Sequence, residues 1–118
     1  MELGARALGN RSIIANPSRI ENLRDLNIAI KMRDFWMPFA PSIIQELSNT
    51  LINNPKNIMS PHMMFAFDTT QDGAQKIAAA THPRDKTARA QIVSAEINQN
   101  YHKLIREFYN LTKIPCVL

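Results

Sequence analysis

Two arginines near the start of the chain, Arg6 and Arg11, lie around a turn in the segment GARALGNRSIIANP, where Gly4 and Gly9 bracket the turn. Glycine accepts positive φ angles and lets a ligand approach the main chain, and arginine presents a planar fork of donors that matches phosphate or carboxylate. The segment therefore predicts an anion-binding turn. A surface turn with solvated arginines is the alternative that the pattern leaves open.

Two further cations, Lys31 and Arg33, stand in the segment IKMR at the end of a predicted helix. In one interpretation they are solvated and offset the negative end of the helix dipole. In the other they contact an anion.

Thr87, Arg89 and Gln91 alternate with small residues in the segment KTARAQ. In a strand these three side chains project from one face, while Ala88 and Ala90 project from the other. The pattern fits a strand that lines a polar cavity, and it fits an exposed strand face equally well.

The three histidines are weaker candidates for a functional site than the arginines and Lys31. His82 precedes this segment in ATHPRD, and a lone histidine more often makes a structural hydrogen bond than acts as an acid or base. The sequence assigns it no carboxylate neighbour. His62, His82 and His102 lie in three different predicted elements and lack metal-ligand spacing, so we expect no metal site here.

These side chains need elements to position them, and the first is a helix predicted over residues 19–33. Ser18 and Glu21 have the spacing of a capping box at its start. Two prolines then punctuate the segment FAPSIIQEL, which we expect as a short extended segment at a sheet edge or element start. Residues 47–57 predict a weak helix followed by a loop.

From residue 62 the pattern changes to short runs bounded by turn residues. Strands are predicted over residues 62–67, 76–81 and 88–94. Residues 68–75 contain an Asp-Gly pair and predict a hairpin turn.

A second helix is predicted over residues 97–111, because apolar residues recur there at helical spacing, with Asn98 or Ser94 as its cap. Residues 114–118 predict a buried strand. The fold class is α/β of the α+β type, with a two-layer mixed or antiparallel sheet of about four or five strands and packed helices. The stripe residues expected to face the sheet are Tyr101, Leu104, Ile105, Phe108 and Leu111.

The composition is that of a globular domain, with 45% hydrophobic and 20% charged residues in 118. We expect one domain over residues 1–118, no membrane span, no signal peptide and a cytoplasmic location. The lone cysteine, Cys116, is expected to be a small buried hydrophobe. The net charge of +4 favours acidic partners, but the cations are dispersed, which argues against a nucleic-acid arm.

Four blocks in fixed order carry a resemblance to a known family. They are GARALGNRSIIANP, IKMRDFWMPFAPSI, SPHMMFAF and ATHPRDKTARAQIV. Together they resemble the C-terminal region of the O-carbamoyltransferases, a family that includes nodulation-factor, cephalosporin and aminoglycoside carbamoyltransferases. The resemblance implies a YrdC-like fold, truncated at both ends. It also implies a longer enzyme, whose N-terminal domain binds the acceptor and a metal.

The resemblance implies a reaction as well. This region of the family binds ATP, with magnesium, and carbamoyl phosphate, and it forms carbamoyl-adenylate for transfer to an acceptor hydroxyl. The family usually has glycine where this chain has Lys86. The implied catalytic residues are Lys31, Arg89 and His82. The implied substrate-binding residues are Arg6, Asn10, Arg11, Ser12, Arg33, Thr87 and Gln91.

Two expectations follow for the chain itself. Arg6, Arg11, Lys31 and Arg89 should converge on one anion cavity, and the isolated chain should not complete carbamoyl transfer. We also expect exposed apolar surface and self-association where other parts of the enzyme would bind. A noncatalytic nucleotide-binding or regulatory module is the alternative function, and nucleic-acid binding is a third.

Overall fold

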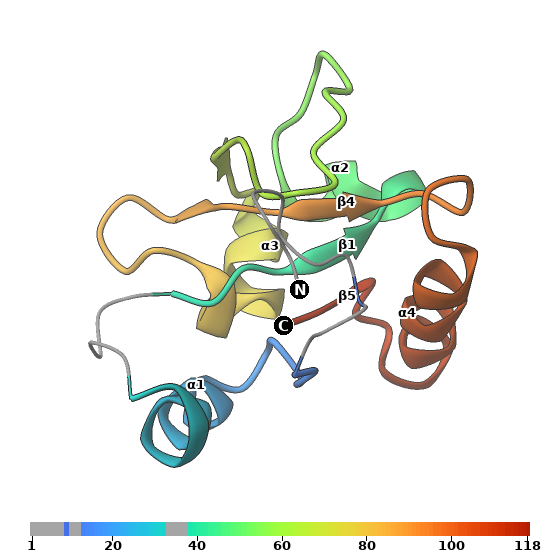
Figure 1. Cartoon of the computed structure of the whole chain (residues 1–118). Coiled ribbons are helices and arrows are strands. Elements are labelled where there is room, and N and C mark those ends of the chain that lie inside the picture. The colour runs from blue at the N-terminus through green and yellow to red at the C-terminus, as the bar shows by residue number, and fades with distance from the viewer. Residues whose placement is uncertain (1–8, 10–12, 33–37) are drawn as a thin grey trace.

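The computed structural model describes residue 9 and residues 13–32 and 38–118, and its centre is a three-stranded sheet (Figure 1). The strand order is β4 (Gln91–Val93), β1 (Ser42–Ile44) and β5 (Cys116–Val117). β1 is parallel to β4 and antiparallel to β5, so this sheet is mixed. All residues of the three strands are buried, as expected for a sheet covered on both faces.

The expectation of a strand after the two prolines is confirmed, but β1 is central rather than at an edge. Pro41 lies just before the strand, and its carbonyl oxygen accepts a hydrogen bond of 2.8 Å from the main-chain N–H of Gln91. A proline in this position removes no N–H from the ladder, because the strand's paired residues start at Ser42.

A second sheet has two antiparallel strands, β2 (Phe67–Asp68) and β3 (Thr87–Ala88). The single strand expected over residues 88–94 is therefore wrong, because β3 and β4 belong to different sheets. The strand expected over residues 62–67 is reduced to its last residue. The fold is thus α+β with two small sheets within the described residues, instead of one sheet of four or five strands.

The largest correction falls on residues 68–81, where helix replaces the expected hairpin and strand. α3 (Gln71–Lys76) begins at Thr70, whose hydroxyl oxygen accepts a 2.9 Å hydrogen bond from the N–H of Gly73. A one-turn 3-10 segment, Ala78–Ala80, follows. Gly73 is the glycine of the Asp-Gly pair, and a Cβ there would clash with the carbonyl of Leu51. The glycine therefore permits close helix packing instead of a hairpin turn.

α1 (Ile20–Leu26) continues into a π-helical turn, Asn27–Lys31, which confirms the helix predicted in this region. The capping box is wrong, because Arg19 is the N-cap and its side chain makes no capping hydrogen bond. The main-chain N–H and the hydroxyl of Ser18 instead both donate to the side-chain oxygen of Asn16, at 3.0 and 2.8 Å. An Asx turn therefore precedes α1.

α4 (Gln99–Thr112) covers one face of the central sheet, and its predicted cap is confirmed. The side chain of Asn98 accepts a 3.1 Å hydrogen bond from the N–H of Tyr101. Tyr101 and Ile105 are buried against the sheet, but Leu104 is 46% exposed and Leu111 85% exposed. The apolar stripe predicted on α4 extends beyond the short strands that the helix covers. Leu104 and Leu111 of this stripe therefore remain in solvent.

The remaining elements are short. A 3-10 turn, Gln45–Leu47, leads into α2 (Ser48–Leu51), which confirms the weak helix plus loop predicted there. The loop that follows rises at the top of Figure 1. β5 confirms the predicted buried strand, and burial raises the pKa of the Cys116 thiol there. In the described ranges no helix is long and apolar enough to cross a membrane.

Candidate functional site

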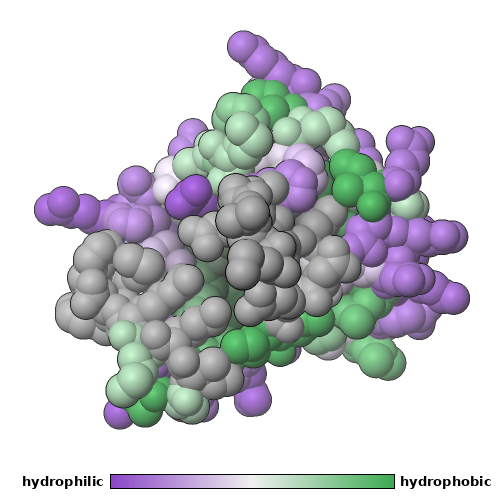
Figure 2. All heavy atoms as spheres, viewed as in Figure 1, coloured by the Kyte–Doolittle hydropathy of each residue, from purple (hydrophilic) through white to green (hydrophobic). Residues whose placement is uncertain are grey.

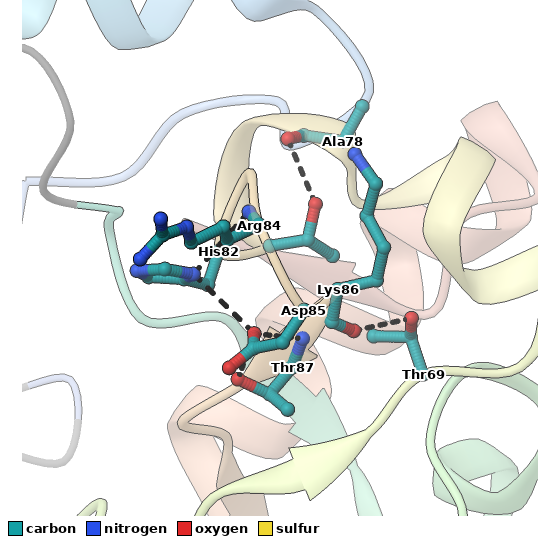
Figure 3. Close-up of polar contacts among 8 residues, drawn as sticks. Thr69, Ala78, His82, Arg84, Asp85, Lys86 and Thr87 are labelled. Atoms are coloured by element: carbon teal, nitrogen blue, oxygen red, sulfur yellow. Dashed lines mark hydrogen bonds and ion pairs between the residues drawn. The ribbon is translucent and has the colours of Figure 1, made fainter.

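Residues 82–87 form a hydrogen-bonded loop between the 3-10 segment and β3 (Figure 3). The N–H of His82 donates to the carbonyl of Thr87 at 2.8 Å, and the N–H of Lys86 donates to the carbonyl of His82 at 3.0 Å. Thr69, beside β2, ties the loop to the small sheet through its N–H and hydroxyl, which both donate to the Lys86 carbonyl, at 3.3 and 2.6 Å. The main chain of the loop is thus fixed at both ends and at its tip.

Lys86 has a φ of 58°, in the left-handed region that glycine favours. Its side chain is exposed. This conformation gives a physical reason for a glycine in the corresponding position of the resembled family. In this chain the residue is lysine, for which a left-handed conformation is unfavourable in free energy. The lysine also adds a positive charge to the loop.

Asp85 is the acid of the loop, and sequence analysis did not select it. One carboxylate oxygen, Oδ1, accepts hydrogen bonds from the N–H of Thr87 at 3.0 Å and from its hydroxyl at 2.8 Å. These two bonds, the main-chain one first, hold the pKa of Asp85 below its usual value. The Asp-x-Thr spacing is the sequence signal that would have found this Asx turn.

The imidazole of His82 lies beside this carboxylate. Its Nδ1 is 3.3 Å from Oδ1 of Asp85 and 3.4 Å from the main-chain nitrogen of Arg84. The Arg84 contact is a hydrogen bond in which Nδ1 is the acceptor, whereas the Asp85 contact is an ion-pair distance that applies when the imidazole is protonated. The structure thus supplies the carboxylate neighbour that the sequence did not assign.

Arg89 follows β3 and is exposed. One guanidinium nitrogen, Nη2, donates to the carbonyl of Met63 at 3.0 Å, which links the loop region to residues 61–66. Arg84, Lys86 and Arg89 form no ion pair with any carboxylate in the described part of the chain. Figure 2 shows hydrophilic side chains projecting at the left edge, where Figure 1 places this loop. The loop is therefore a basic, solvent-facing rim.

Gln91 is placed differently from Arg89 and Thr87. It is buried in β4, and its side-chain oxygen accepts a 3.1 Å hydrogen bond from the hydroxyl of Ser42, its partner in β1. Burial raises the pKa of Tyr101 on α4, and Ser42 opposes part of this effect. A buried hydrogen bond thus joins β4 and β1.

Gly9 packs against the ring of Tyr101. A Cβ at Gly9 would lie 2.5 to 2.9 Å from ring atoms of Tyr101, and its φ is 76°. The second glycine of the N-terminal motif is therefore required by packing and by its backbone conformation. The structure thus brings Gly9 against Tyr101 of α4.

The other predicted site residues cannot be placed in the same way. Lys31 ends the π-helical turn, and only its main chain is described. The convergence of the four cations remains a prediction. Five predicted substrate-binding residues lie outside the described residues: Arg6, Asn10, Arg11, Ser12 and Arg33.

His102 takes part in a second polar contact, between α4 and the 3-10 turn that follows β1. Its buried ring lies with Nε2 at 3.0 and 2.9 Å from the two carboxylate oxygens of Glu46. Burial raises the pKa of Glu46, but the hydrogen bond with His102 leads the effects that outweigh it and keep the pKa below its usual value. This pair links α4 to the turn that follows β1.

In the ranges 13–32 and 38–118, no three His, Cys, Asp or Glu side chains lie close enough together to hold a metal ion. A metal ion held beside these residues would therefore need ligands from elsewhere.

Together these features define an α+β protein with a basic loop suited to an anionic ligand. Residues 1–118 match the family described as the carbamoyltransferase C-terminus, and the chain belongs to this family. It is 39% identical to nodulation protein NolNO of Sinorhizobium fredii, over 99% of this chain and 17% of that protein. It is 32% identical to nodulation protein U of Rhizobium tropici, over 98% of this chain and 20% of that protein.

The family also extends to proteins without an assigned role. An uncharacterized protein of Methanocaldococcus jannaschii is 38% identical over 100% of this chain and 19% of its own length. The chain thus spans about a fifth of the length of these curated relatives. Its family membership, predicted from the four sequence blocks, is confirmed.

Proposed function

We propose that this chain is the part of an O-carbamoyltransferase that binds ATP and carbamoyl phosphate and forms carbamoyl-adenylate. The family match supports a role in carbamoyl transfer. The finer assignment draws on the resemblance of the four sequence blocks and on the character of the 82–89 loop. A YrdC-like fold belongs to the same proposal.

The observation that carries the proposal is the charge of this loop. Arg84, Lys86 and Arg89 are exposed and have no carboxylate partner within the described residues, while Asp85 is engaged by Thr87 and His82. Cations that lack local counter-charges repel one another, and a polyanion between them relieves that repulsion. Phosphoryl transfer needs this arrangement, since positioning and positive charge supply most of its catalysis.

The reaction balances with one water. Carbamoyl phosphate and water give carbamate and inorganic phosphate. A carbamate oxygen then attacks the α-phosphorus of ATP, and the bond to pyrophosphate breaks. The products are carbamoyl-adenylate and pyrophosphate, and no covalent enzyme intermediate is required. The rest of a longer enzyme would transfer the carbamoyl group to a hydroxyl acceptor, which agrees with the chain's share of its relatives' length.

The test is exchange of labelled pyrophosphate into ATP by the full-length gene product. Exchange should depend on carbamoyl phosphate, and Arg89→Lys should lower it about 10-fold or more. Lysine keeps the charge but loses the planar fork, and one hydrogen bond to a charged group contributes about 1.5–3 kcal/mol. Arg24→Lys is the matched control, because Arg24 is an exposed arginine on α1, outside the basic loop.

The proposal fails if the wild-type protein shows no exchange that depends on carbamoyl phosphate. Binding of ATP without exchange would favour a noncatalytic nucleotide-binding module. Equal exchange in Arg89→Lys and Arg24→Lys would remove Arg89 from the site.

A further inference from the structure

Asn27 interrupts the inward face of α1 at the point where the π-helical turn begins. It follows Leu23 by four residues, so the two residues share one face of the helix, and Leu23 packs against the main core. Asn27 is only 7% exposed. A buried amide on the core-facing side of a helix departs from the apolar pattern there, and such departures are expected at functional sites.

The side-chain oxygen of Asn27, Oδ1, is buried and has no hydrogen-bond partner within the described residues. The main chain of Asn27 is engaged, because its N–H donates to the carbonyls of Leu23 and Arg24. Its carbonyl accepts a 2.6 Å hydrogen bond from the N–H of Met32. A buried acceptor without a donor is unfavourable, since it has lost its hydrogen bonds to water. Oδ1 is therefore the acceptor of Asn27 that still lacks a donor.

The turn that Asn27 begins is connected to the basic loop. It ends at Lys31, for which the resemblance implies a catalytic role. α1 contacts the 3-10 segment Ala78–Ala80, and the chain continues from this segment into residues 82–87. The N–H of Ala79 also donates to the carbonyl of Pro17, just before α1, at 3.0 Å. π-helical turns occur frequently at functional sites, so this turn is a second part of the candidate site.

The missing partner of Oδ1 must be a hydrogen-bond donor. Ionised phosphate oxygens only accept hydrogen bonds, so the phosphates of ATP and carbamoyl phosphate do not qualify. The carbamoyl group carries an –NH2 group, whose two N–H bonds match an amide oxygen. The amino group of adenine is also a donor, but it is attached to a large ring, whereas the carbamoyl group is small enough for a buried position.

We propose that Asn27 is a specificity-determining residue for the carbamoyl group, whose –NH2 donates to Oδ1. This inference rests on the proposed function, because it takes carbamoyl phosphate to be the substrate. A site that presents an acceptor to an N–H group discriminates against an analogue without that group, since the buried acceptor is then left unpaired. Acetyl phosphate is such an analogue, because it has a methyl group in place of the –NH2.

The first experiment compares the two acyl phosphates by calorimetric titration of the full-length gene product, in the cold to limit their hydrolysis. The wild type should bind carbamoyl phosphate about 10-fold or more tightly than acetyl phosphate. Asn27→Leu removes the acceptor, so it should reduce this preference to about 2-fold or less, mainly by weakening the binding of carbamoyl phosphate. Asn100→Leu is the matched control, since Asn100 is an exposed asparagine on α4, and it should keep the wild-type preference.

The second experiment measures the Tm of the 118-residue chain without ligand. Asn27→Leu removes a buried acceptor that has no partner in the described part of the chain, and leucine has the higher helix propensity, so the Tm should stay the same or rise. A lower Tm would show that the asparagine stabilises the fold, and it would overturn the proposal.

The outcomes separate this inference from the proposed function. An unchanged preference in Asn27→Leu, or a wild type that does not distinguish the two acyl phosphates, overturns the role of Asn27, even if exchange of pyrophosphate depends on carbamoyl phosphate. If Asn27→Leu does not fold, Asn27→Ala also removes the acceptor, and a preference retained in that variant overturns the role. A preference that is lost in Asn27→Leu, in a protein without pyrophosphate exchange, supports the role of Asn27 and refutes the proposed function.

Discussion

Replacing Lys86 by glycine should stabilise the protein, although it removes a side chain. Lys86 has a φ of 58°, and a left-handed conformation costs a residue with a Cβ about 1–2 kcal/mol. Glycine avoids this cost but makes the unfolded chain more flexible, which offsets about 0.4–1 kcal/mol. The net gain is about 0.5–1 kcal/mol, or about 2–5 °C in Tm for a domain of this size.

The contacts of residue 86 allow this substitution. Its hydrogen bonds to His82 and Thr69 in the described part of the chain use its main-chain N–H and carbonyl, which glycine retains. The free energy of unfolding is measured by urea titration of the wild type and Lys86→Gly. Lys86→Ala keeps the conformational cost and should be within about 0.5 kcal/mol of the wild type.

A second control tests whether glycine is tolerated in general. Lys103 is an exposed lysine within α4, and Lys103→Gly should destabilise by about 1 kcal/mol because residue 103 is helical. If Lys86→Gly is less stable than Lys86→Ala, the loop does not require a left-handed residue at this position, and the argument fails. A gain in stability with weaker ATP binding would show that the lysine is retained for its charge.

Three further predictions address packing and pH. Gly9→Ala should destabilise by about 2–4 kcal/mol, measured in urea, because the new methyl meets the ring of Tyr101 at a left-handed position. Phe108→Ala should cost less than the about 3–5 kcal/mol expected of a fully buried ring, since Phe108 is half-buried, and Leu111→Ala should leave Tm unchanged. Glu46→Gln should cost under about 1 kcal/mol at pH 7, because Glu46 is half-exposed. Its pKa is lowered on folding, so this difference should vanish as pH falls from about 5 to below the folded pKa.

The elements that were predicted well from the sequence have an apolar pattern that continues over several turns or a clear signal at one end. α4 has four turns of helical spacing and an asparagine cap, and both are found. β1 and β5 are short apolar runs next to prolines, and both are buried strands. The position of β1 in the sheet was not predictable, because strand order depends on contacts between distant segments.

The errors arise where tertiary contacts override a local pattern. Asp-Gly is a strong hairpin signal, but Gly73 lies inside α3 because that helix packs on the main chain of Leu51. The alternation around Arg89 suggested one strand, yet the chain passes from one sheet to the other at that point. The periodicity of a sequence indicates to which face each side chain points. It does not indicate which strand pairs with the segment.

The candidate site was predictable in its residue types but not in its partners. His82, Thr87 and Arg89 were selected from the sequence, and the structure places all three in or beside one loop. Asp85 was missed, because its position beside His82 depends on an Asx turn with Thr87. Gln91 shares their sequence pattern but is buried between β4 and β1, where it accepts a hydrogen bond from Ser42.

The 82–87 loop and the buried Gln91 would affect the proposed ligand site in different ways. The 82–87 loop is ordered by its own hydrogen bonds and by Thr69, so little conformational entropy remains to be lost when an anion binds. Gln91 is hydrogen-bonded to Ser42 between β4 and β1, and Gly9 packs on Tyr101 of α4. A substitution of Gln91 would therefore disturb the pairing of β4 with β1, and in the proposed site it would affect ligand binding only through packing, whereas a substitution of Arg89 would remove a direct contact with the proposed anion.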